Sequence, residues 1–124
     1  MKEYKNLIYK NVEEYKEIKD TTKKNFVIEI DFSQFKKFQD IDKFLSTKID
    51  APDHYFGGLN RLFDLLVDFQ DFDNPKKIVF LIKSYLHLKQ IDKQYYKYFL
   101  KLCNDAIEHH KKIKSGELEV YVFR

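Results

Sequence analysis

Apolar and polar residues follow one another along the chain in patterns that predict three strands. Residues 26–30 are aromatic or β-branched apart from Glu29, as expected of a strand. Residues 78–82 contain no polar side chain, which is typical of a strand buried on both faces in the middle of a parallel sheet. In residues 118–123, leucine and valine alternate with a second face that is only partly polar, which predicts an edge strand.

Two further segments have the spacing of amphipathic helices. Asp40 is placed to cap a first helix, whose apolar positions are Ile41, Phe44, Leu45 and Ile49. A longer helix is predicted from Asp92 to about Lys114, because lysines and histidines in its last turn, before Gly116, favour the helix dipole. Its predicted apolar stripe comprises Tyr95, Phe99, Leu102, Cys103, Ala106, Ile107 and Ile113.

Strands separated by helices predict an α/β fold in which a small parallel three-stranded sheet is packed with helices. The 78–82 strand is predicted to lie at the centre of this sheet. Residues 1–24 form an N-terminal extension of mixed charge. Because residues 7–9 and several later positions of the extension are apolar, we expect it to add a strand or a helix to one edge of the domain.

The composition is that of a single packed domain, with 124 residues of which 44% are apolar. No apolar run approaches 18 residues and the first residues contain no apolar segment. Neither a membrane span nor a secretory signal is therefore predicted, and we expect a cytoplasmic protein. The single cysteine, Cys103, suits a reducing compartment, and its apolar helical neighbours predict a buried, inert thiol.

The most distinctive segment is residues 52–69, where the turn sequence Pro-Asp-His-Tyr-Phe-Gly-Gly precedes an amphipathic helix. One helix face is apolar (Leu59, Leu62, Phe63, Leu66) and another is polar and acidic (Asn60, Asp64, Asp68). Residues 52–73 hold five aspartates and one arginine, a net charge of −4 in a chain of +3. This segment is either an ordinary solvated helix face or a surface that steers a basic partner.

Residue combinations suited to catalysis are sparse. The histidines at 54, 87, 109 and 110 lack the spacing of a zinc site, and the glycines at 57 and 58 lack the further glycine or lysine of a phosphate-binding loop. Asp64 and His54 are able to exchange protons, but the sequence places no nucleophile with them. We therefore expect no enzymatic activity, no cofactor and no bound metal.

Lysines at 76 and 77, the basic residues 109–114 and nine tyrosines offer phosphate contacts and stacking to a nucleic acid. However, twenty acidic residues interrupt any continuous basic stripe. We expect no direct binding to nucleic acid and no binding to membranes. A salt-dependent shift with RNA would contradict the first expectation.

The element order and the 52–66 segment resemble the barstar family of ribonuclease inhibitors, over about residues 25–124. The resemblance implies a barstar-like domain at residues 25–124, preceded by the extension 1–24, which has no counterpart in the family pattern. The family pattern is proline, an acidic residue, two aromatic residues and a glycine, followed by Leu-Asp-x-Leu-Trp-Asp-x-Leu. Residues 52–66 read Pro-Asp-His-Tyr-Phe-Gly-Gly-Leu-Asn-Arg-Leu-Phe-Asp-Leu-Leu, so that Asn60 replaces an aspartate and Phe63 a tryptophan. The first aromatic position aligns with His54 without a gap, or with Tyr55 after a shift of one residue.

The resemblance implies an intracellular immunity protein, one half of a toxin–antitoxin pair, that blocks the active site of a cognate basic ribonuclease. Family members place an aspartate where the RNA phosphate would bind, and Asp64 matches it. The implied partner-binding residues are His54, Tyr55, Phe56, Asn60, Phe63, Asp64 and Asp68. Near the end of its last helix the family presents acidic residues, whereas this chain has the basic run 109–112 with only Glu108 nearby. The alternative is a non-inhibitory protein-interaction module that uses the same surface.

Overall fold

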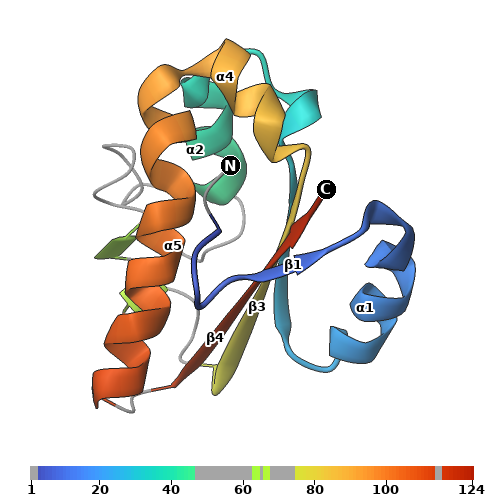
Figure 1. Ribbon diagram of the computed structural model, residues 1–124, viewed down its shortest axis with the longest axis vertical. Helices are drawn as coiled ribbons and strands as arrows, with labels where there is room; N and C mark the ends of the chain where they lie inside the picture. Colours follow the sequence, from blue (N-terminus) through green and yellow to red (C-terminus); the bar gives the residue numbers. More distant parts are fainter. Residues whose placement is uncertain (1–2, 47–62, 65, 68–74, 114–115) are drawn as a thin grey trace.

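The computed structural model describes residues 3–46, 63–64, 66–67, 75–113 and 116–124. These residues form an α/β structure around a four-stranded, wholly parallel sheet of order β1-β4-β3-β2 (Figure 1). The strands are β1 (Ile8–Lys10), β2 (Phe26–Asp31), β3 (Lys77–Lys83) and β4 (Glu117–Phe123). The predicted α/β class with a small parallel sheet is therefore confirmed.

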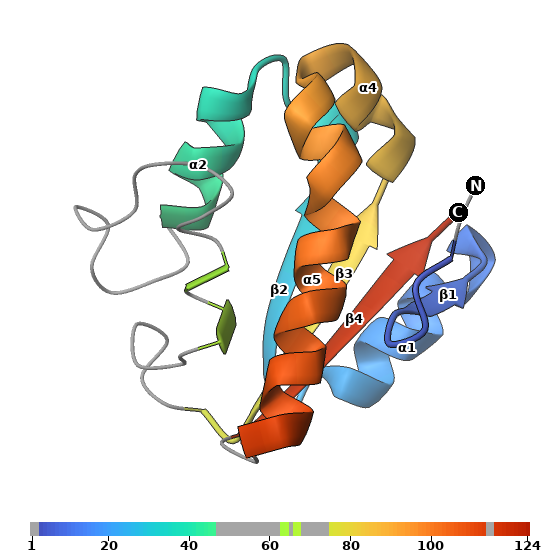
Figure 2. The same ribbon diagram turned by 60° about the vertical axis from the view of Figure 1, so that its left-hand side comes forward.

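Helices cover both faces of this sheet. The helix α1 (Tyr15–Thr22) lies on one face, whereas α2 (Phe38–Ser46) and the long α5 (Lys93–Ile113) lie on the other (Figures 1 and 2). Short helical turns complete the described elements: η1 (Val12–Glu14), η2 (Phe32–Gln34), η5 (Tyr85–His87) and α4 (Leu88–Ile91).

Strand β3 is buried on both faces, as its unbroken apolar sequence predicts. All five residues from Ile78 to Ile82 have no exposed surface. On the α5 side, Phe80 meets the ring of Phe99 edge to face, with centroids 6.0 Å apart. On the α1 side, Val79 and Leu81 pack with Phe123 in a second, smaller cluster. The central strand is thus held between two hydrophobic layers.

The predicted strand count and edge were wrong. The sheet has four strands, because residues of the N-terminal extension form β1, which pairs with β4 from Ile8 opposite Tyr121 to Lys10 opposite Phe123. Strand β4 is consequently an interior strand and not the predicted edge. The second face of β4 is partly apolar because Tyr121 and Phe123 pack in the cluster beneath α1. A three-residue strand such as β1 is too short to give a period of its own.

Two helix predictions also need correction. Helix α2 begins at Phe38, so Asp40 lies in its first turn and is not the capping residue before the helix. The Asp40 carboxylate accepts a hydrogen bond from the Lys36 amide at 3.4 Å. Ile41 of the predicted face is fully buried, while Ile49 lies outside the described residues. In α5, Ile113 is 52% exposed, and the buried stripe ends one turn earlier, at His110.

The burial of Leu7 predicts that the N-terminal extension belongs to the same folding unit as the rest of the sheet. Leu7 is 6% exposed and lies in the main core, so Leu7→Ala should lower the free energy of unfolding by about 2–5 kcal/mol. The measurement is urea unfolding followed by circular dichroism. Val12→Ala, at a position 49% exposed, is the control and should change the free energy by less than about 0.5 kcal/mol. Equal, small effects would contradict this assignment.

Candidate functional site

The structure describes two of the seven predicted partner-binding residues. His54, Tyr55, Phe56, Asn60 and Asp68 lie outside the described residues. Phe63 and Asp64 are described, with Leu66 and Val67, and all four have helical backbone. We refer to these four residues as the Asp64 helix.

The Asp64 helix has the two faces that its sequence predicts. Leu66 is fully buried in the main core, and Phe63 and Val67 pack against that core from partly buried positions. Asp64 is exposed. The carboxylate is therefore presented to solvent from helical backbone whose opposite side is anchored in the protein interior.

The Asp64 helix is tied to α5 by a buried histidine. His110 is 4% exposed, and its Nε2 lies 2.7 Å from the carbonyl oxygen of Leu66. The two residues are 44 positions apart in the chain. The sequence contains one signal of this contact: His110 follows Phe99, Cys103 and Ala106 at helical spacing, on the buried face of α5.

The last turns of α5 are also bound to the N-terminal extension. Asn6 Nδ2 donates to the Glu108 carboxylate at 2.7 Å, and Lys111 Nζ donates to Asn6 Oδ1 at 2.6 Å. The hydrogen bond from Asn6, and then the charge of Lys5, lower the pKa of Glu108. Glu108, which directly precedes the basic run 109–112 in the sequence, is thus engaged within the protein. These contacts span about a hundred residues, so the sequence pattern does not reveal them.

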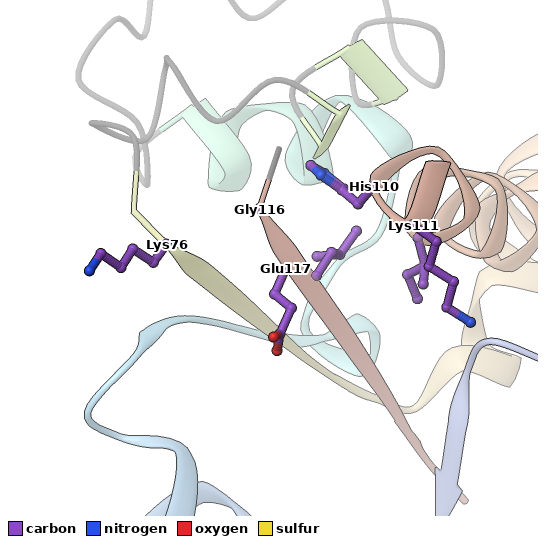
Figure 3. A pocket seen from close by; sticks show the side chains of 7 residues that line it. Lys76, His110, Lys111, Gly116 and Glu117 are labelled. Carbon is purple, nitrogen blue, oxygen red and sulfur yellow. The ribbon is translucent and has the colours of Figure 1, made fainter. Parts of the chain in front are cut away.

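A pocket of about 420 Å³ opens beside His110, at the amino ends of β3 and β4 (Figure 3). Its described lining includes the apolar Ile107 and Leu118. The charged ends of Lys76, Lys111 and Glu117 diverge from one another (Figure 3), and Glu117 pairs with Lys77 at 3.5 Å. The described side chains therefore do not converge on a common ligand position. Ligands of parallel α/β sheets usually bind at the opposite, carboxyl ends of the strands.

At the carboxyl ends of β2 and β3, polar groups form hydrogen bonds with Asp31. Asp31 Oδ1 accepts hydrogen bonds from the Ser33 amide at 3.0 Å and hydroxyl at 2.7 Å, which caps η2. Burial alone would raise the pKa of Asp31, but hydrogen bonds from Ser33 and Ser84 and the charge of Lys83 leave it below its usual value. Ser84 has a left-handed backbone (φ 58°). This arrangement is a cap between two strand ends and presents no nucleophile–base pair.

The described residues also limit metal, thiol and membrane chemistry. Among them, no three His, Cys, Asp or Glu side chains are grouped closely enough to hold a metal ion. Cys103 is fully buried, and burial raises the pKa of its thiol. The predicted burial of the thiol is confirmed. Its raised pKa disfavours the reactive thiolate. No helix in the described part of the chain is long and apolar enough to cross a membrane.

The lowered pKa of Asp31 should make part of the free energy of unfolding depend on pH. Because its folded pKa is lowered, the unfolded chain binds more protons near pH 4, and the stabilisation present above that pH is lost as pH falls through the folded pKa. Asp31→Asn should therefore show a shallower loss of unfolding free energy between pH 5 and 2 than wild type, measured by urea titration at each pH. Ser33→Ala, which removes one donor, should change the slope in the same direction. Identical slopes in all three proteins would refute this role.

Comparisons with protein-family models, with curated proteins and with solved structures found no match to this chain. A functional assignment therefore depends on the resemblance in the sequence and on the geometry of the described residues. Of that geometry, the anchored, outward-facing Asp64 is the feature with the clearest chemical use.

Proposed function

We propose that this protein is an intracellular inhibitor of a cognate ribonuclease toxin, which it binds through the Asp64 helix and the acidic segment 52–73 that contains it. The observation that carries the proposal is the exposure of Asp64 on a helix whose other side chains, Leu66 above all, are anchored in the core. A carboxylate held in this way needs little ordering when it binds. The parallel order of β2, β3 and β4 with helices between them also agrees with the fold that the resemblance implies.

In the proposed mechanism, Asp64 occupies the position of the RNA phosphate. A ribonuclease active site carries arginine and lysine side chains for an anion, and a carboxylate accepts charge-assisted hydrogen bonds from the same groups. His54, Tyr55 and Phe56 would supply rigid contact area next to it, and Asn60 a polar contact. Phe63 would contribute its partly exposed ring, and Asp68 an outer negative charge.

The charge distribution supports a basic partner. Residues 52–73 carry a net charge of −4, so the remainder of the chain carries +7. A basic ribonuclease is attracted to the first region and repelled by the second, which favours encounters in one orientation. The exposed α5 residues Lys93 and Lys97 belong to the repelling part. No cofactor and no catalytic step is required of the inhibitor itself.

Because Glu108 is already engaged within the protein, we place the proposed interface at the Asp64 helix. Asn6 already holds the Glu108 carboxylate, and Lys5 lies 3.9 Å from the same carboxylate oxygen. A partner would have to displace these groups to use Glu108. We therefore assign most of the electrostatic attraction to Asp64 and its acidic neighbours.

If this protein is an inhibitor, the gene beside its own should encode the ribonuclease toxin. The test compares two aspartate variants in an inhibition assay with the product of that gene. Asp64→Ala should weaken inhibition by about 2–5 kcal/mol, because the positive groups of the enzyme site would lose their partner. Asp20→Ala is the matched control, since Asp20 is also an exposed helical aspartate but lies on α1, across the sheet. It should change inhibition by less than about 0.5 kcal/mol.

Two results would contradict the proposal. Equal losses for both variants would show that the interface is misplaced. Tight binding that leaves the nuclease active, or a neighbouring gene without a nuclease domain, would favour the non-inhibitory interaction module.

A further inference from the structure

We propose that His110 is a positioning residue for the inhibitory surface: its ring holds the Leu66 carbonyl and so fixes the direction in which Asp64 faces the ribonuclease. This inference rests on the proposed function. It concerns a residue that lies on a different element from the predicted binding residues and is itself almost completely buried.

The chemistry of the contact defines the direction of the hydrogen bond. A backbone carbonyl only accepts, so at 2.7 Å the ring nitrogen Nε2 must carry the hydrogen and donate it to Leu66. This holds for the neutral ring protonated at Nε2 and for the charged ring alike. The bond is buried, where a carbonyl that loses its donor is costly because water cannot replace it.

The position of His110 suits it to this task. The 21-residue helix α5 is fixed along the sheet by Phe99, Cys103 and Ala106, all without exposed surface. His110 is the next residue on the same buried face, so its ring projects from a rigid element. Its polar ring occupies a place where an apolar side chain would suffice for packing alone. Figure 3 shows the labelled His110 side chain directed away from Lys111 and toward the segment that contains the Asp64 helix.

Leu66 is two residues from Asp64, so a constraint on its carbonyl acts directly on the Asp64 helix. The apolar contacts of Phe63, Leu66 and Val67 hold this helix against the core but are not directional. A hydrogen bond from a fixed ring adds the direction. Losing it should leave the helix packed but less precisely held, and an inhibitor that must place one carboxylate among the enzyme's cations would then bind less tightly.

The experiment uses three variants of the full chain and two measurements. His110→Leu keeps the bulk of the ring without the donor, whereas the side-chain amide of His110→Gln reaches a similar position and can donate. Thr22→Val is the control, because Thr22 is equally buried and its hydroxyl donates to the Ile18 carbonyl at 2.9 Å, but it lies in α1 on the other face of the sheet. NMR measures amide exchange of Leu66 and Val67 in the free protein, and stopped-flow measures dissociation from the ribonuclease encoded by the adjacent gene.

We expect His110→Leu to accelerate both the exchange at Leu66 and Val67 and the dissociation of the complex by about tenfold or more, as for a buried carbonyl that loses its donor. His110→Gln should restore both toward wild type, and Thr22→Val should change neither. If His110→Leu does not fold, His110→Asn, which withdraws the donor from Leu66, replaces it.

Unchanged exchange in His110→Leu, or a glutamine variant no better than the leucine variant, would overturn the inference. Faster exchange with unaltered dissociation would also overturn it, since His110 would then be only structural. If wild-type protein does not bind the ribonuclease at all, the proposed function fails and His110 keeps no role in inhibition, while the exchange data still show whether it holds the helix.

Discussion

The layers of the protein follow from the burial of β3 on both faces. A strand with five consecutive residues that have no exposed surface needs a hydrophobic layer on each side. Helix α5 and the Asp64 helix supply one layer, with α2 beside them, while α1 and the side chains of Tyr15 and Phe123 supply the other. The N-terminal extension is therefore not an appendage, because it provides the second layer and the strand β1 that covers the edge of β4.

The sequence predicted those parts of the fold whose signal is local and continuous. The apolar run 78–82, the aromatic and β-branched residues of 26–30, the alternation in 118–123 and the long apolar stripe of α5 are each visible within one continuous stretch of sequence. The strand β1 has three residues, and its pairing with β4 joins positions more than a hundred residues apart, so no local pattern contains it. Helical spacing places Ile113 on the α5 stripe, but it is the last residue of that helix and is exposed.

The local features of the candidate site were likewise predictable from the sequence, whereas its tertiary contacts were not. The separation of Phe63 and Leu66 from Asp64 onto different faces follows from helical spacing and is seen in the structure. The restraint of this helix by His110, and the engagement of Glu108 and Lys111 by Asn6, are tertiary contacts between groups whose residue types have many other uses. Together these contacts suggest one physical picture: a single carboxylate held outward by the core and by α5, on the acidic part of a chain that is otherwise basic.

An NMR titration of the labelled protein with a catalytically inactive form of the ribonuclease expected from the adjacent gene tests the proposed interface most directly. An interface at the Asp64 helix predicts saturation at one equivalent, with the largest shifts at Asp64 and its helical neighbours and none at the exposed residues of α1, such as Asp20. Saturable shifts centred on α1, or no shifts at all, would contradict it.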